Sequence, residues 1–146
     1  MRAPLLAAAV LVLAACGGDA TGPNANSNVT GLWTYNATNL STTGISCNIS
    51  NATFTLTQTG SSFTGTATGG TISCTAGGET DTGDLGTAPI ANGQINGNAV
   101  QFDIGTSDLH NAGTRNGNSI SGTLTARVDL ETTVVTLTGN FSLVKK

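Results

Sequence analysis

The chain has 146 residues, a formal net charge of −3, and a composition in which 9% of residues are charged and 4% are aromatic. Five basic residues against eight acidic ones exclude a surface that attracts nucleic acid. The length fits a single domain, and the regular spacing of the apolar residues excludes a disordered chain.

The N-terminal stretch has the features of a secretion signal. Arg2 precedes an apolar run, residues 5–13, that is too short to span a bilayer. Leu13-Ala14-Ala15-Cys16 closes this run and resembles the lipobox of bacterial lipoproteins. The resemblance implies cleavage before Cys16, a lipid on Cys16 and a membrane as partner. The alternative is an ordinary signal peptide cleaved near Ala15, which would leave Cys16 as a free thiol.

The rest of the chain divides into a linker and a folded part. Residues 16–28 are small and polar and predict a flexible tether after a signal peptide at residues 1–15. Residues 29–146 then form the folded domain. Lipidation would place this domain in the bacterial cell envelope, at the outer membrane or a periplasmic face rather than in the cytoplasm.

Alternation of apolar and polar residues predicts an all-β domain without helices. Gly-Ser and Asn-Gly pairs between the segments predict tight hairpin turns. Residues 76–88 are rich in Gly and acids and lack alternation, so they are predicted to be the longest loop. The eight expected strands are residues 30–38, 45–58, 63–75, 89–95, 100–104, 108–115, 119–130 and 133–144.

A turn at Gly60-Ser61 fixes the pairing of the second and third expected strands. It sets Cys47 opposite Cys74, at a separation that suits a disulfide. Because exported proteins meet an oxidising environment, we predict this bond. The same register sets residues 51–52 opposite residues 69–70, where two glycines allow both strands to bend.

Eight short strands with tight turns fit a closed antiparallel meander or a β-sandwich. We favour the closed barrel, because closure removes exposed strand edges that these nearly uncharged strands do not protect. Gly31-Leu32-Trp33 opening the first strand resembles the lipocalin and avidin class of barrels. The lipocalin resemblance implies a basic residue from a late strand stacked on Trp33, and Arg127 is the candidate. The chain is also similar to small lipid-anchored barrel proteins of bacteria, for which no reaction is implied.

The inward positions support two hypotheses from different classes. In the first, inward glycines leave room for a small apolar or amphipathic ligand inside the barrel, oriented by the polar groups of Tyr35 and Asn111. In the second, the barrel is filled, and the protein has a structural or interaction role in the envelope. The predicted lining of the ligand cavity is Trp33, Tyr35, Phe54, Leu56, Phe63, Phe102, Asn111, Leu124 and Phe141.

Catalysis has little support in the sequence. His110 is the only histidine, with Asp108 and Asp103 as the nearest acids, and no nucleophile accompanies them. Asp108 and His110 are two residues apart and are expected on the outer face, which indicates a surface histidine. We therefore predict no enzymatic activity and no cofactor.

A weak calcium candidate remains in the acidic stretch that we expect to be a loop. Glu79, Asp81 and Asp84 supply oxygen ligands among several glycines. Their spacing does not match an EF-hand loop, and solvated acidic side chains explain the pattern equally simply. We therefore predict no metal site, with these three acids as the only candidates.

Overall fold

The computed structural model describes residues 28–105, 109–130 and 133–146, nearly all of which are in β-strands. The ten strands are β1 (Gly31–Thr42), β2 (Ile45–Thr59), β3 (Ser62–Thr68), β4 (Thr71–Ala76), β5 (Glu79–Asp84), β6 (Thr87–Asn96), β7 (Ala99–Ile104), β8 (Leu109–Asn116), β9 (Ser119–Leu130) and β10 (Thr133–Lys145).

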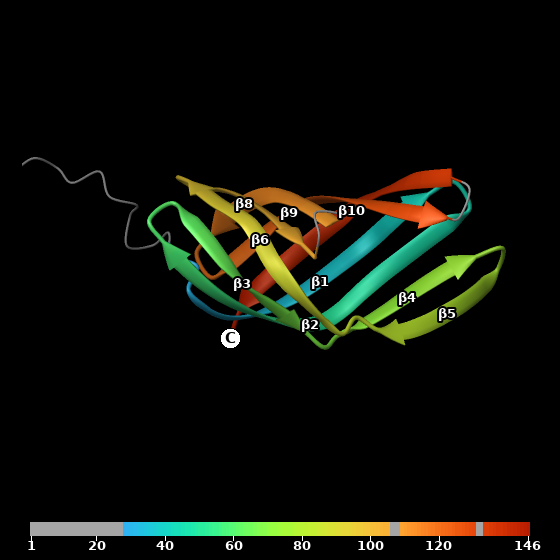
Figure 1. Ribbon diagram of the computed structural model, residues 1–146, viewed down its shortest axis with the longest axis horizontal. Helices are drawn as coiled ribbons and strands as arrows, with labels where there is room; N and C mark the ends of the chain where they lie inside the picture. The colour runs from blue at the N-terminus through green and yellow to red at the C-terminus, as the bar shows by residue number, and fades with distance from the viewer. Residues whose placement is uncertain (1–27, 106–108, 131–132) are drawn as a thin grey trace, which may run out of the picture.

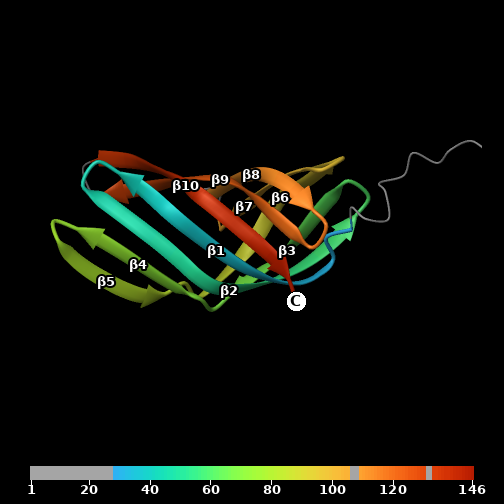
Figure 2. The same cartoon turned by 180° about the vertical axis from the view of Figure 1, so that it is seen from behind.

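Eight of these strands close an antiparallel barrel, which confirms the predicted fold and excludes the β-sandwich (Figure 1). The order around the barrel is β1-β10-β9-β8-β7-β6-β3-β2, and pairing of β1 with β2 completes the circle. Within the barrel each strand is followed by its neighbour in the sheet, with β3 leading to its partner β6 through the β4–β5 hairpin, as expected of a meander. β4 and β5 continue beyond the barrel as a hairpin on the free side of β2 (Figure 2).

The predicted hairpin register is confirmed. Cys47 pairs with Cys74 across β2 and β4, and a disulfide joins them. Pairing of β2 passes from β3 to β4 at a bend, where Asn51, Gly69 and Gly70 adopt φ angles of 59°, 60° and 89°. Glycine adopts this left-handed conformation without steric cost, so two adjacent glycines allow the third expected strand to split into β3 and β4.

The prediction of a long loop at residues 76–88 is wrong. The segment contains β5, which pairs with β4 through a two-residue turn at Gly77-Gly78, with φ angles of 60° and 87°. All six residues of β5 are exposed. Hydrophobic alternation reports burial on one face, and a strand with no buried face leaves no such signal.

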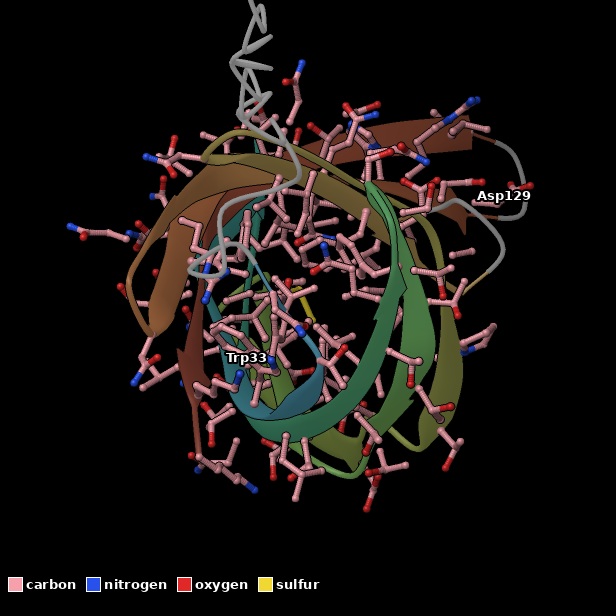
Figure 3. All side chains as sticks on the ribbon, turned by 90° about the vertical axis from the view of Figure 1, so that its left-hand side faces the viewer. Trp33 and Asp129 are labelled. Carbon is pink, nitrogen blue, oxygen red and sulfur yellow. A yellow bond between two sulfur atoms is a disulfide. The ribbon has the colours of Figure 1, made fainter. Side chains whose placement is uncertain are left out.

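The two ends of the barrel differ. At one end, here called the closed end, the chain crosses beneath the interior at Val29, whose carbonyl accepts a hydrogen bond of 2.8 Å from the Trp33 indole. Figure 3 looks along the barrel from this end, with Trp33 inside the ring of strands. The tight turns between β2 and β3, β6 and β7, and β8 and β9 lie here. The opposite, open end carries the β4–β5 hairpin (Figure 1).

The basic residue that packs on Trp33 is Lys145 rather than Arg127. The Lys145 ammonium lies 5.5 Å from the centre of the indole ring. Arg127 is exposed because its position on β9 alternates with the inward residues Leu124 and Ala126. The expectation for Arg127 is therefore wrong, and the last strand supplies the stacked cation.

The outer edge of β5 pairs with no other strand among the described residues. This edge carries Glu79, Asp81 and Asp84, and the Asp81 carboxylate accepts a hydrogen bond of 2.9 Å from the backbone N–H of Thr82. Charged side chains on an edge strand oppose pairing with another chain. Barrel closure leaves the β5 edge unpaired among the described residues, and three acidic residues lie on this edge.

Neutralising this edge should promote self-association. We expect Glu79→Gln, Asp81→Asn and Asp84→Asn in combination to shift the protein from monomer toward dimers and larger species, because the free backbone groups lose their charged protection. Size-exclusion chromatography with light scattering over a concentration series measures the shift. Asp129→Asn, which lies outside β5, serves as the control and should stay at the wild-type mass. A triple variant that remains monomeric at all concentrations would contradict the protective role.

Candidate functional site

The barrel interior, the predicted ligand cavity, holds five aromatic rings in mutual contact. The Tyr35 and Phe54 rings stack with centroids 4.6 Å apart, and Phe102 lies 6.1 Å from Phe54. Phe63 and Phe141 lie 6.0 and 5.5 Å from Phe102 on its other sides. Each of the five side chains is at most 3% exposed. The structure therefore brings the predicted lining residues together as a packed cluster.

The two polar groups that were expected to orient a ligand bond to each other. The Tyr35 hydroxyl donates a hydrogen bond of 3.0 Å to Asn111 Oδ1, and the Asn111 amide donates one of 3.3 Å to the Leu109 carbonyl. Both side chains are fully buried. Burial raises the pKa of the Tyr35 phenol, so the group is neutral and acts as a donor. The pair satisfies its own hydrogen bonds inside an apolar core.

Neighbouring atoms occupy the space beside the inward glycines. A Cβ added at Gly93 would lie 2.6 Å from the Phe63 ring, and one at Gly65 would lie 2.9 Å from a Leu56 methyl. At Gly113, an added Cβ would lie 3.0 Å from the Phe141 ring. The nearest atom at each of the three positions is a backbone carbonyl oxygen of the paired strand, so the strand backbone and the adjoining side chains together leave no room for a Cβ.

Three depressions lined by described residues lie away from the aromatic cluster. One of about 690 Å³ lies over β6, β7 and β8, one of about 370 Å³ lies at the β8–β9 turn, and one of about 460 Å³ lies at the open end beside Gly44. None of these three is lined by the nine predicted cavity residues.

The open end carries partly buried apolar side chains. Partly buried apolar residues there continue the core toward solvent, and the Cys47–Cys74 disulfide lies among them. On β9 and β10, Val128 pairs with Val135 and is 38% exposed. The partly buried set is Ile45, Ile72, Cys74, Leu85, Ala88, Leu109 and Val135.

His110 is on the outer face, as predicted, but it has a partner on the neighbouring strand. Its Nδ1 lies 2.6 Å from Oδ1 of Asp103, and the Asn92 amide donates a hydrogen bond of 2.7 Å to the other carboxylate oxygen. The His110 side chain is 55% exposed, whereas that of Asp103 is 11% exposed. Sequence reasoning missed Asn92, which has a φ of 53° at a bulge in β6.

The network favours the ionised form of Asp103. Burial of the carboxyl raises its pKa, but hydrogen bonds from Asn92 and His110 and the charge of His110 lower it by more. The pKa of Asp103 is therefore below its usual range. The carboxylate orients the imidazole ring in the way that a catalytic base or a metal ligand would need. Asp103 and His110 are directly opposite each other on β7 and β8, so their contact stabilises the pairing of these strands.

Replacing Asp103 with Asn should lower the free energy of unfolding by about 1 to 2 kcal/mol near pH 7, because two hydrogen bonds to a charged group are weakened. A lowered folded-state pKa means that this contribution is present above the unfolded pKa of about 3.9 and is lost as the pH falls through the folded value. Denaturant unfolding of both proteins between pH 7 and pH 2 measures it. The difference should shrink at acidic pH, while Asp129→Asn should match the wild type throughout. A difference independent of pH would contradict this assignment.

The calcium candidates are not gathered into a site. Among residues 28–105, 109–130 and 133–146, no three His, Cys, Asp or Glu side chains are grouped to hold a metal ion. Glu79 and Asp81 alternate with Asp84 along β5, so they point to opposite faces of the hairpin. Asp84 also accepts a hydrogen bond of 2.6 Å from the Gly86 backbone N–H.

Several predicted features lie outside the described residues: the signal peptide, Cys16 with the tether through residue 27, Asp108, and the turn at 131–132. No helix among the described residues is long and apolar enough to cross a membrane. Comparison of the chain with protein-family models, with curated proteins and with solved structures found no match.

Proposed function

We propose that the protein is a lipid-anchored interaction or structural module of the bacterial cell envelope, with a filled barrel as a rigid scaffold and contacts made through its outer surface. The observation that carries this proposal is the packed interior, where five aromatic rings meet and neighbouring atoms occupy the glycine positions. An interior filled in this way leaves little room for a ligand of the lipocalin kind. The surface is then the part available for binding.

The anchor is the second element of the proposal and rests on the lipobox-like sequence that ends at Cys16. We expect the wild-type protein in the membrane fraction and Cys16→Ser in the soluble envelope fraction, because several acyl chains on one residue give stable attachment. Mass spectrometry of the mature N-terminus measures the lipid directly. Equal membrane association of both proteins would contradict the anchor. Cys47→Ala with Cys74→Ala, which leaves Cys16 intact, is the control and should remain in the membrane.

A second candidate function is the binding of a small apolar or amphipathic molecule at the open end. The partly exposed apolar residues there, including Ile72 and Val135, favour it. Native mass spectrometry of protein purified from its own cells, together with uptake of an apolar dye, separates the two functions. The scaffold proposal predicts no bound molecule and no uptake. A co-purified ligand displaced by Ile72→Asp would support the second function instead.

A further inference from the structure

Basic and acidic side chains lie at opposite ends of the barrel. The closed end carries Arg115, Lys145 and Lys146, and no acidic residue among those the structure describes. The open end has one described base, Arg127. In Figure 3, viewed from the closed end, Asp129 lies outside the ring of strands that encloses Trp33. The five described acidic residues, all toward the open end, are Glu79, Asp81, Asp84, Asp103 and Asp129.

Arg115 is a buried cation without an anionic partner. It is 8% exposed and pairs with Ile120 on an inward-facing row of β8 and β9. Its Nε donates a hydrogen bond of 2.9 Å to the Gly117 carbonyl, while its Nη1 is buried and has no hydrogen-bond partner among the described residues. Among the described residues, the carboxylate that forms an ion pair is Asp103, and its partner is His110 rather than Arg115. A buried guanidinium without a counter-charge is costly, and a bound anion would remove that cost.

A polar depression lies beside this guanidinium. It has a volume of about 370 Å³ and is lined by Arg115, Asn98 and the turn residues Asn116, Gly117 and Asn118. Side-chain amides offer N–H donors to an anion. The backbone N–H of Lys145 donates a hydrogen bond of 2.9 Å to the Asn118 carbonyl, so the end of β10 is adjacent to the same turn. The side chain of Lys145 lies over Trp33, and that of Lys146 donates to the Thr53 hydroxyl.

We propose that this depression is a binding site for a phosphate group, with Arg115 as its charged ligand and the amides of Asn98, Asn116 and Asn118 as neutral donors. A guanidinium is a preferred ligand of phosphate oxygens. No acidic side chain among the described residues lies at the closed end to repel an anion. Sequence reasoning gave this cluster no role, although a charged residue at an inward strand position was a signal.

The phosphate can come from a phospholipid headgroup or from free phosphate. The described chain begins at this end, since Val29 crosses beneath the barrel and residue 28 precedes it. An anchor at Cys16 would therefore hold the closed end toward a membrane, and the acidic open end would point away. The proposed phosphate site does not depend on the anchor. Only the choice of a phospholipid as the source of the phosphate rests on the proposed function.

Titration of the full chain with inorganic phosphate tests the site. We expect saturable amide shifts in the NMR spectrum, confined to residues 98 and 115–118. Asn118→Asp, which places a carboxylate in the depression, should weaken binding at least about ten-fold by charge repulsion. Asn140→Asp, an exposed position on the outer face of β10, makes the same change elsewhere and should bind as the wild type does. No saturable shift at these residues, or equal binding by Asn118→Asp, would overturn the site.

Vesicles then distinguish the two sources. Unlipidated full chain with Cys16→Ser is mixed with phosphatidylcholine vesicles alone or with one third phosphatidylglycerol. A lipid source predicts binding to the anionic vesicles that falls about five-fold with Lys146→Glu, does not fall with Arg127→Glu, and is competed by phosphate. Phosphate binding without vesicle binding supports the site with free phosphate as its ligand. Release of Cys16→Ser from the membrane in cells tests the anchor separately. A failure of the anchor proposal therefore does not imply a failure of the phosphate site, or the reverse.

Discussion

Phe102→Ala should lower the free energy of unfolding by about 3 to 5 kcal/mol, the cost of removing a large buried side chain whose space does not refill. Phe102 is 1% exposed, and its ring contacts those of Phe54, Phe63 and Phe141. Its removal therefore opens a void at the centre of the aromatic cluster. Denaturant unfolding measures the loss, and Leu32→Ala, at a position 49% exposed, should cost far less.

The same variant tests the filled barrel. A dry apolar void binds small apolar molecules, so we expect Phe102→Ala to gain affinity for benzene or a comparable probe that the wild type does not bind. Unfolding measured with and without the probe would show the variant stabilised and the wild type unchanged. A wild-type protein stabilised as strongly as the variant would contradict a filled interior. A variant that neither loses stability nor binds would contradict the packing role of Phe102.

Removal of the Cys47–Cys74 bond should cost about 3 to 4 kcal/mol. The two residues are 27 positions apart, and a cross-link across a loop of this length restricts the unfolded chain by about that amount. Denaturant unfolding of the wild type with and without reductant measures the effect. The double variant Cys47→Ala with Cys74→Ala should resemble the reduced wild type and should not respond to reductant.

Loss of the bond should also have a local consequence. β4 is joined to β2 by this bond and by main-chain pairing, and its other neighbour, β5, is exposed throughout. We expect faster amide exchange in β4 and β5 after reduction, with little change in β9 and β10. Uniformly faster exchange over the whole barrel would contradict a locally held hairpin, and unchanged stability would contradict the bond's contribution.

The closed meander could be predicted from the sequence because two signals determine hairpin register. These are the turn residues and the alternation of buried and exposed side chains along each strand. One turn at Gly60-Ser61 correctly paired Cys47 with Cys74. Features that depend on neither signal were missed. β5 has no buried face, so alternation could not detect it.

The side-chain networks were harder to predict than the strands. The bulge between Ala91 and Gln94 shifts β6 by one residue, which determines how Asn92 reaches Asp103. A bulge has no fixed sequence pattern, so this contact could not be read in advance. Arg115 differs, because alternation already placed its position on the inner face. The sequence therefore shows a charged residue at a position expected to be apolar. Only the structure shows that its Nη1 has no hydrogen-bond partner among the described residues.

The bend at Gly69 and Gly70 makes the outer half of one hairpin separable from the barrel. Thr68 pairs directly with Thr87, and the Gly69 N–H donates a hydrogen bond of 2.8 Å to the Gly86 carbonyl. Joining Gly69 to Gly86 would therefore close the same two strands with a Gly-Gly turn of the favoured hairpin kind. The ring of eight strands does not include the segment between these points, although its deletion would remove Cys74 and the pairing of β4 with β2. The segment is thus a place where evolution or an engineer can exchange one projecting hairpin for another while the scaffold is inherited unchanged.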